Sequence, residues 1–364
     1  MIVQKDSFQR FLLLIVLLIT ILNKLKNRIT IRHIARELGI SAMTVSRALN
    51  NRSNVDEMTK KKVLETAKRM GYKPNHIARS LTTRKTYTIG VVVPKLLSSF
   101  FPDAIQGIEE VAFKKNYQIM LTHSSENPDR ENQVIEALVS KRVDGILIST
   151  AQTVKNFKSY DDLLDSKYPI VFFDRWLPGI EASCVRTNDK EIAQKVTDHL
   201  IDVHKYVKIA HISGPSELSI ADDRKQGYIT SMKSHDLKIE DEWIVSANFD
   251  EETGYKATQK LLELPKKKRP RAIFAVNDSS AFGAMEAIYD AGLKIPEDIA
   301  IVGFTDDKQD KLLNPPLTTV HQPAYEMGKR ATQILIDLIE GKSTAIEDII
   351  IKSHIVIRKS CGCD

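Results

Sequence analysis

The most constraining feature of this chain of 364 residues is an alternation of short apolar runs and helical patterns between residues 86 and 360. The apolar runs predict strands at residues 88–93, 118–121, 145–148, 170–173, 209–212, 272–276 and 299–302. Apolar residues at helical spacing lie between them, for example at residues 104–115, 189–201, 279–291 and 324–339. Continuous apolar strands separated by helices indicate parallel sheets that are covered on both faces. Because one compact lobe needs fewer strands, the pattern predicts two α/β lobes.

Residues 30–50 have a different pattern, which predicts two short helices joined by a tight turn. Gly39 stands where the first helix should end, and Ser41 is a favourable N-cap for the second. The inner sides of the two helices are predicted to hold Ile31, Ile34, Ala35, Leu38, Val45 and Leu49. Two helices around a short glycine-containing turn form a helix-turn-helix, whose second helix enters the major groove of DNA. The outward side of the second helix has no acidic residue, which favours DNA binding over a chance helical hairpin.

A third helix is predicted from Glu57 to Met70, with Gly71 directly after its end and Pro74 closing the segment. Its inner side is predicted to hold Val63, Leu64, Ala67 and Met70. Residues 75–82 follow as a short and mostly polar segment. A helix of this length is poorly populated without a partner, so these residues taken alone predict a linker.

The formal net charge of +6, from 53 basic and 47 acidic side chains, is distributed unevenly along the chain. Residues 24–85 contain sixteen basic and four acidic side chains, a net +12, and residues 1–23 add +1. Residues 86–364 therefore carry −7. A small basic block joined to an acidic body is typical of a nucleic-acid-binding head on another domain, although a solvated basic face has the same composition.

The segments at residues 30–50, 60–75 and 76–82 closely resemble the head and hinge of the LacI/GalR family of bacterial transcriptional regulators, and the resemblance covers residues 29–360. It implies that the second helix contacts operator DNA. Base edges would be contacted by Ala42, Met43 and Arg47, and phosphates by Thr44, Ser46 and Asn50. Leu81, with Ala78 beside it, would wedge between base pairs in the minor groove. Many relatives have polar residues at the positions of Ala42 and Met43, so the operator sequence does not carry over.

Residues 86–360 resemble the type I periplasmic-binding-protein fold, in which the chain crosses three times between two lobes that enclose an effector. The resemblance places the crossings near Thr187–Asn188, Thr318–Gln322 and Gly341–Ser343. The predicted organisation is an N-terminal extension at 1–28, a DNA-binding head at 29–74, a hinge helix and linker at 75–85 and the body at 86–360. Lobe one is expected at residues 86–188 and 320–342, and lobe two at 189–319 and 343–358.

Polar residues that directly follow strands are candidates for the cleft, because clefts in such folds lie at the carboxyl ends of the strands. Asp174 and Arg175 follow one strand, Asn277 and Asp278 follow another, and Arg224 begins a helix after a loop. The resemblance implies effector contacts from Phe101, Asp174, Arg224, Phe249 and Asn277. Two alternatives stay open: Asp278 either contacts the effector or caps the helix that begins at Ser279, and Arg224 either contacts the effector or forms a surface ion pair.

Thr305 marks a departure from the family pattern. Many relatives have an acidic residue directly after a glycine–aromatic pair, and here Thr305 follows Gly303 and Phe304. Thr305 thus occupies the place of a carboxylate that contacts the ligand, and the identity of the effector cannot be transferred. A sugar or a sugar phosphate is the leading class of effector.

Phe11 to Leu22 is apolar except for Thr20, and this run is too short to span a membrane core, which needs about 20 residues. Lys5 and Arg10 precede it, as in a signal peptide, but no small-x-small cleavage site follows. Three interpretations stay open: a non-native extension, which is favoured, a membrane or packing segment, and a true signal peptide.

Signals for metal binding and catalysis are weak. Cys361 and Cys363 are too isolated in the sequence for zinc, which needs four ligands, and are predicted to lie in a frayed tail. The sequence has no H-E-x-x-H, phosphate-loop or nucleophile-elbow motif, so no metal, cofactor or catalytic residue is predicted.

The combined prediction is a cytoplasmic, homodimeric regulator, with repression favoured, that binds a palindromic operator in double-stranded DNA and responds to a small-molecule effector. The alternative classes are an exported solute receptor, which has no use for residues 30–82, and a membrane-tethered regulator that uses residues 11–22 as an anchor.

Overall fold

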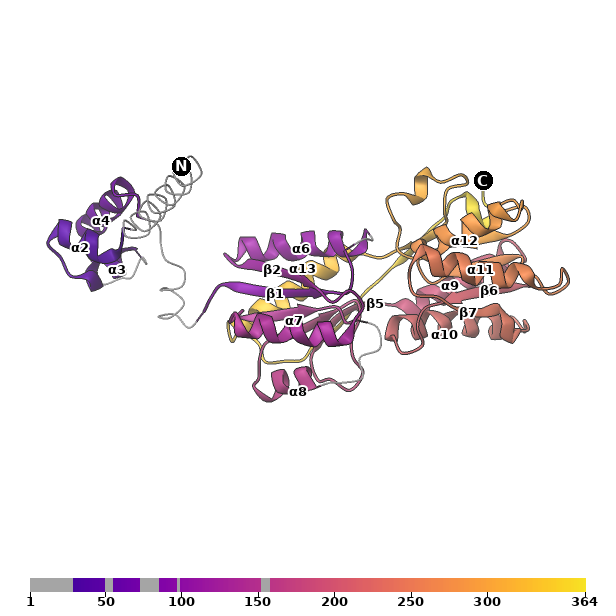
Figure 1. The fold of residues 1–364 in the computed structure, drawn as a ribbon, viewed down its shortest axis with the longest axis horizontal. Helices are drawn as coiled ribbons and strands as arrows, with labels where there is room; N and C mark the ends of the chain where they lie inside the picture. Colours follow the sequence, from indigo (N-terminus) through magenta and orange to yellow (C-terminus); the bar gives the residue numbers. More distant parts are fainter. Residues whose placement is uncertain (1–28, 50–54, 73–84, 97–98, 152–157) are drawn as a thin grey trace, which may run out of the picture. The chain divides into compact units, whose positions relative to one another are not determined.

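The computed structural model describes all residues of the chain except 1–28, 50–54, 73–84, 97–98 and 152–157 (Figure 1). Contacts between residues divide the chain into two units, a head at residues 1–84 and a body at residues 85–364. The predicted extension at 1–28 and the predicted DNA contacts Asn50, Ala78 and Leu81 lie outside the described residues. Within the described part of the chain, no helix is both long and apolar enough to cross a membrane.

The head consists of three short helices, α2 (Ile31–Leu38), α3 (Ala42–Leu49) and α4 (Glu57–Arg69), around a small apolar core. The turn between α2 and α3 forms as predicted. Gly39 has φ 64°, which a glycine adopts without strain, and Ser41 Oγ accepts a hydrogen bond from Thr44 N at 3.0 Å. The core contains Ile34, Ala35, Val45, Ala48, Val63 and Ala67. Leu64 was predicted to face inward but is exposed, because Thr66 takes the inner position on α4.

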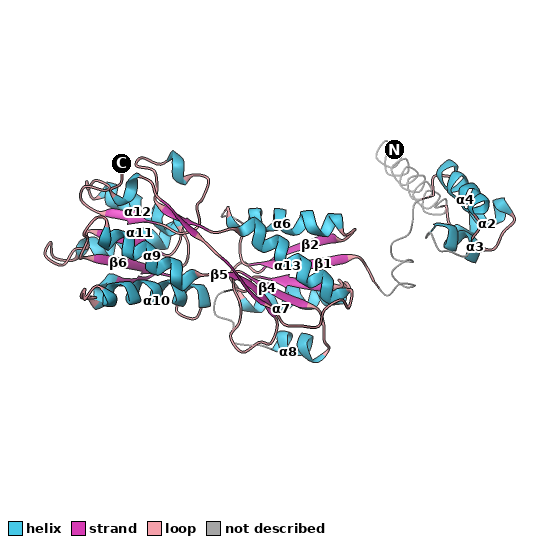
Figure 2. Ribbon diagram, turned by 180° about the vertical axis from the view of Figure 1, so that it is seen from behind, coloured by secondary structure: helices cyan, strands magenta, loops and turns pink. Residues whose placement is uncertain are grey.

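Lobe one of the body is built on a six-stranded parallel sheet in the order β11-β5-β4-β3-β1-β2. Its strands are β1 (Thr88–Val93), β2 (Gln118–His123), β3 (Gly145–Ile148), β4 (Ile170–Phe173), β5 (Ser183–Thr187) and β11 (Asp348–Ile351). Successive residues of β1 point to opposite faces: Ile89 and Val91 pack on α6 (Phe100–Lys114) and α13 (Ala324–Ile339), and Val92 packs on α7 (Pro128–Ser140) and α8 (Lys158–Asp165). Figure 2 shows these helices on the two sides of the sheet.

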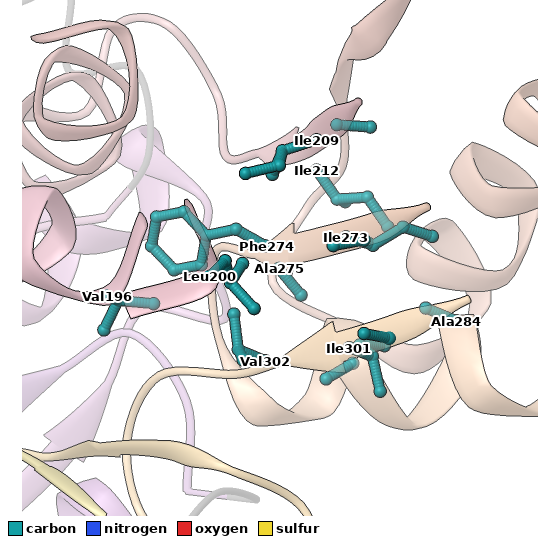
Figure 3. Close-up of a cluster of buried hydrophobic side chains, with 14 of the residues drawn as sticks. Val196, Leu200, Ile209, Ile212, Ile273, Phe274, Ala275, Ala284, Ile301 and Val302 are labelled. Carbon is teal, nitrogen blue, oxygen red and sulfur yellow. The ribbon is translucent and has the colours of Figure 1, made fainter. Parts of the chain in front are cut away.

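Lobe two has a four-stranded parallel sheet in the order β7-β6-β8-β9. Its strands are β6 (Ile209–Ser213), β7 (Ile244–Ser246), β8 (Ala272–Ala275) and β9 (Ala300–Val302). Four helices pack in two pairs, α9 (Asp189–Asp202) on α10 (Ser219–Ser234) and α11 (Glu251–Glu263) on α12 (Asp278–Asp290). Figure 3 shows Phe274 on the side of Leu200 from α9, and Ile301 on the side of Ala284 from α12. The fold class predicted from the alternating pattern, a helical head followed by a two-lobed α/β body, is confirmed.

The chain crosses between the lobes at three places. It passes from β5 to α9 at Asn188, from β10 (Thr319–His321) to α13, and from β11 to β12 (His354–Val356). The two later crossing segments pair with each other, because β10 and β12 form a small antiparallel sheet. The predicted crossing at Gly341–Ser343 is wrong. Asp348–Ile351 pairs in parallel with β5 and extends the sheet of lobe one, so the third crossing comes at residues 352–353.

The C-terminal residues are folded, so the prediction of a frayed tail is also wrong. Residues Lys359–Cys361 form the short 3-10 helix η3, and Cys361 is 0% exposed. Ser360 Oγ donates to Ile301 O at 2.7 Å and accepts from Thr318 N at 2.8 Å. These bonds hold the tail against the edge of the sheet in lobe two.

Candidate functional site

Helix α3 presents two of the predicted DNA contacts to solvent. Met43 is 64% exposed and Arg47, one helical turn later, is also exposed, while Val45 and Ala48 are buried in the head. No acidic residue lies in the first turn of α3. Ala42, Thr44 and Ser46 are half-buried, and the Thr44 hydroxyl lies 2.8 Å from Ser41 Oγ. The predicted base-facing pair thus shares one outward side, which is the arrangement that groove insertion needs.

A cavity of about 380 Å³ lies in the body and is lined by residues from both lobes. It brings together every residue that was predicted to contact the effector: Phe101, Asp174, Arg224, Phe249, Asn277, Asp278 and Thr305. These residues come from distant parts of the sequence, yet they converge because the strand ends of both sheets face this space. The volume falls within the range of about 300–1,000 Å³ that is usual for small-molecule sites.

Asp174 and Arg175 follow β4 and line the cavity from lobe one. Both side chains are buried, and burial raises the pKa of Asp174 to about 6 in spite of the nearby guanidinium groups of Arg175 and Arg224. Arg175 Nη1 donates to both carboxylate oxygens of Glu126 at 3.0 Å. Its guanidinium carbon lies 5.2 Å from the ring centroid of Phe249, so an aromatic face from lobe two packs on a cation from lobe one.

Arg224 lines the cavity from lobe two, and its guanidinium is already bonded within the protein. Arg224 Nε donates to Asp189 Oδ1 at 2.8 Å, and Nη1 donates to Val276 O at 2.7 Å. The guanidinium carbon lies 3.7 Å from the ring centroid of Phe304. Arg224 is only 2% exposed, so the alternative of a surface ion pair is wrong, and the ion pair with Asp189 is buried.

Asn277, and not Asp278, caps helix α12. Asn277 Oδ1 accepts from Ser280 N at 3.0 Å, and Asn277 Nδ2 donates to Phe249 O at 3.2 Å. Asp278 occupies the first position of the helix, where its buried carboxylate accepts from Thr319 Oγ1 and from Asp307 N. The proposed capping role of Asp278 is therefore wrong, because its side chain points toward the crossing strand β10.

Asp278 also pairs with a second buried carboxyl group. Burial and the neighbouring Asp278 raise the pKa of Asp310 to about 10. The pKa of Asp278 is raised too, because the group is completely buried. Asp310 is therefore protonated at neutral pH, which relieves the repulsion between the two buried carboxyl groups.

Several residues around the cavity have strained backbones. Glu126, Asp174 and Phe249 have φ values of 57°, 62° and 61°, and Thr305 has φ 151°. Residues other than glycine adopt these φ values at a cost in free energy. Such backbone strain concentrates at binding and catalytic sites. Thr305 N donates to Val320 O at 2.8 Å, which connects this strained position to β10.

Other lining residues were not among the predicted contacts: Lys95, Glu126, Arg175, Asp307 and Gln322. Arg175 was a candidate for the cleft from its position directly after a strand, although no effector contact was predicted for it. Gln322 Nε2 is buried and has no hydrogen-bond partner among the described residues, so it offers a donor to a ligand. The lining contains three cationic side chains, Lys95, Arg175 and Arg224, and seven acidic ones: Glu126, Asp174, Asp250, Glu251, Glu252, Asp278 and Asp307. The formal charge of the lining is therefore −4.

A helix-turn-helix head followed by a two-lobed α/β body defines a class of DNA-binding regulatory proteins, and family comparisons agree with both parts. Residues 30–75 match the family described as "Bacterial regulatory proteins, lacI family". Residues 197–361 match the family described as "Periplasmic binding protein-like domain".

Related proteins match nearly the whole chain. The HTH-type transcriptional repressor PurR of Mannheimia succiniciproducens is 33% identical over 334 residues, which is 91% of this chain and 98% of that protein. Catabolite control protein A of Priestia megaterium is 34% identical over 328 residues, 90% of this chain and 97% of that protein. A solved transcriptional regulator CelR–cellobiose complex has a TM-score of 0.70 at 25% identity and covers 92% of this chain and 100% of that chain. This chain therefore belongs to the lacI family of bacterial regulatory proteins, as its sequence motifs predicted.

Proposed function

We propose that this protein is a cytoplasmic transcriptional repressor that binds a palindromic operator as a homodimer and responds to a neutral sugar in the cleft between its lobes. The observation that carries the proposal is the convergence of the predicted effector contacts on one cavity, in a chain that also has a helix-turn-helix head. One relative is named a transcriptional repressor and the other a catabolite control protein, and both names support a regulatory role in transcription.

DNA binding is assigned to the outward side of α3. The exposed Arg47 guanidinium can donate to O6 and N7 of a guanine, and the exposed Met43 side chain suits the methyl group of a thymine. Ala42 lies on the same helix beside these two, and Thr44 and Ser46 are assigned to phosphates. The roles of Asn50, Ala78 and Leu81 stay predictions, because these residues lie outside the described part of the chain.

A dimer is supported by apolar side chains exposed on lobe one. Phe113 on α6 is 68% exposed and Leu121 on β2 is 39% exposed. Strand β2 forms one edge of the sheet and packs against α6, so the two side chains belong to neighbouring elements. Exposed apolar groups on an edge strand and an adjacent helix favour burial against a second copy. Twofold symmetry of the protein would match twofold symmetry of the operator.

A neutral sugar fits the cavity better than a sugar phosphate. Arg175 and Arg224 are already paired with Glu126 and Asp189, and the formal charge of the lining is negative. A dianionic phosphate would add charge to a site that already repels anions, whereas neutral hydroxyl groups can donate to Asp174. The rings of Phe101 and Phe249 supply apolar faces of the kind that pack on a sugar ring. The cellobiose complex of the structural relative points to the same class of ligand.

The decisive experiment is a thermal-shift screen of neutral mono- and disaccharides and of sugar phosphates. A neutral sugar is expected to raise the melting temperature, and the rise is expected to be much smaller in Asp174→Asn and to persist in Lys95→Gln. Lys308→Gln is the matched control, because Lys308 pairs with Asp103 and does not line the cavity.

Two outcomes would contradict this assignment. A shift that only sugar phosphates produce, and that Lys95→Gln removes, would replace the neutral sugar by an anionic one. A sugar shift that keeps its full size in Asp174→Asn would place the ligand outside this cavity. Fluorescence anisotropy with operator DNA, measured with and without the identified sugar, then shows whether the sugar strengthens or releases DNA binding.

A further inference from the structure

Two histidines and two cysteines meet at the C-terminal end of the chain, outside the cleft. The ligand atoms of His199, His204, Cys361 and Cys363 all lie within 4.8 Å of one another. Cys363 Sγ is 3.3 Å from His204 Nε2 and 3.8 Å from His199 Nε2. His204 and Cys363 are 159 residues apart in the sequence, so only the folded tail brings them together.

Distinct structural features position each of the four side chains. His199 lies in the last turn of α9, and His204 follows the end of that helix. Cys361 ends η3 and is completely buried, while Cys363 is half-buried. Gly362 between the cysteines has φ 106°, and a Cβ atom there would lie 3.1 Å from His204 Nδ1. The turn that directs both thiols toward the imidazoles therefore depends on a glycine.

Surrounding groups hold this cluster in place. The ring of Tyr206 stacks on His204 with centroids 5.6 Å apart, and the Tyr206 hydroxyl donates to Cys361 O at 3.4 Å. The hydroxyl of Thr318 donates to Cys361 Sγ at 3.2 Å, and such a bond also stabilises a thiolate. The ligand residues are thus supported by hydrogen bonds and stacking that do not use the metal-binding atoms of the histidines.

The distances agree with those of a tetrahedral zinc site. With Zn–N distances of about 2.0–2.1 Å and Zn–S distances of about 2.3 Å, neighbouring ligand atoms lie about 3.3–3.8 Å apart. Both measured contacts of Cys363 Sγ fall in this range, and no two of the four ligand atoms are more than 4.8 Å apart. Two thiolates and two neutral imidazoles around Zn²⁺ also sum to zero charge, which suits a partly buried site.

We propose that His199, His204, Cys361 and Cys363 bind one Zn²⁺ ion. Binding releases the two thiol protons to solvent and forms two Zn–S and two Zn–N bonds. The ion connects the C-terminal tail to the end of α9, next to Thr318, which directly precedes crossing strand β10. It is a structural ion that stabilises lobe two, and it is independent of the sugar proposed for the cleft.

The test uses the full-length protein purified without a polyhistidine tag, stripped with a chelator and then titrated with Zn²⁺ or Co²⁺. Metal content after gel filtration is measured by mass spectrometry, and Co²⁺ reports thiolate ligation in a tetrahedral field through its visible and near-ultraviolet bands. The ligand variants are Cys363→Ser and His204→Gln. His235→Gln is the matched control, since His235 contacts Asp198 and Asp202 and lies outside the cluster.

The wild type and His235→Gln are expected to retain one equivalent of metal, to show thiolate-to-Co²⁺ bands and to melt at a higher temperature with Zn²⁺. Both ligand variants are expected to lose all three properties while matching the melting temperature of the metal-free wild type, which shows that they fold. Substoichiometric metal in the wild type, or equal retention in Cys363→Ser, would overturn the proposal. In buffer without a reductant, an intact mass lower by two hydrogens and no bound metal would instead identify a Cys361–Cys363 disulfide. That result would also overturn the zinc proposal.

Discussion

Thr319 donates its hydroxyl to Asp278 Oδ1 at 2.6 Å, and this bond ties a crossing strand to the floor of the cleft. Thr319 belongs to β10, and Asp278 begins helix α12 in lobe two. Both residues are buried, and Asp278 also lines the cavity. A change in the cleft can therefore act directly on a segment that connects the lobes, without passing through the sheet.

Replacing Thr319 by valine should destabilise the body. Valine has nearly the same shape as threonine but leaves the buried Asp278 Oδ1 without its hydrogen-bond donor. This loss costs about 1–3 kcal/mol in the free energy of unfolding. Urea denaturation followed by circular dichroism measures the loss. Thr230→Val is the control, because among the residues that the structure describes the Thr230 hydroxyl bonds only to Gln226 O of its own helix, and its effect should stay well below that of Thr319→Val. An equal loss in the free energy of unfolding for both variants would mean that the Thr319–Asp278 hydrogen bond does not contribute more to stability than the Thr230–Gln226 bond.

Arg47→Ala should remove sequence discrimination by the head. A bidentate contact to guanine contributes about 1–3 kcal/mol of discrimination against the wrong base. Anisotropy titrations with the operator and with single-base variants should show that the variant no longer distinguishes them. Lys68→Ala removes a positive charge elsewhere in the head and should weaken binding about equally for every sequence. Discrimination that survives in Arg47→Ala would show that α3 presents a different residue to the bases.

The affinity for the proposed neutral sugar should fall as the pH is lowered. Asp174 has a pKa raised to about 6 by burial, and only its ionised form accepts two sugar hydroxyls. Between pH 7 and pH 5 the ionised fraction falls to about one tenth, so the Kd should rise roughly tenfold. Isothermal titration calorimetry at several pH values measures this.

Asp174→Asn separates this effect from other titrations in the body. The carboxyl group of Glu131 has a pKa raised to about 7 by burial, but Glu131 bonds to Tyr160 and Ala151 and does not line the cavity. The variant should bind more weakly and with a flat pH profile between pH 5 and pH 7. A profile that keeps its slope in Asp174→Asn would assign the dependence to another group.

Gly328→Ala should destabilise lobe one, although alanine favours a helix over glycine by about 1 kcal/mol. A Cβ atom at position 328 would lie 2.1 Å from Ala104 O, and one at Gly107 would lie equally close to Tyr325 O. Helices α6 and α13 thus pack through reciprocal glycines, and any added carbon must push backbone against backbone. Overpacking of this kind costs about 1–3 kcal/mol, so the net change is a lower melting temperature. A raised melting temperature would show that the helices separate easily.

Leu121→Lys together with Phe113→Glu should convert the proposed dimer to a monomer. Light scattering after gel filtration would then report a mass near 41.1 kDa in place of twice that value. Ile350→Lys is the matched control, since Ile350 is exposed on β11 at the opposite edge of the same sheet. Dissociation by Ile350→Lys alone would move the interface to that edge.

Much of this protein followed from local sequence patterns. Valine- and isoleucine-rich runs such as residues 88–93 favour strands wherever they pack, and the helix-turn-helix was recognisable because Gly39 and Ser41 act on their nearest neighbours. Asp174 and Asn277 could be assigned to the cleft because the ends of parallel strands share one edge of a sheet.

Other features depended on partners that are distant in the sequence. Residues 183–187 contain serine, cysteine, arginine and threonine and form β5 only because β4 and β11 flank them. The capping alternative for Asp278 is wrong because its partner, Thr319, is 41 residues away in the sequence. The four residues of the proposed zinc site are brought together by the packing of the tail on lobe two. Local propensity acts through neighbouring residues, whereas these contacts exist only after the sheets, crossings and tail have packed, and so only the tertiary structure decided them.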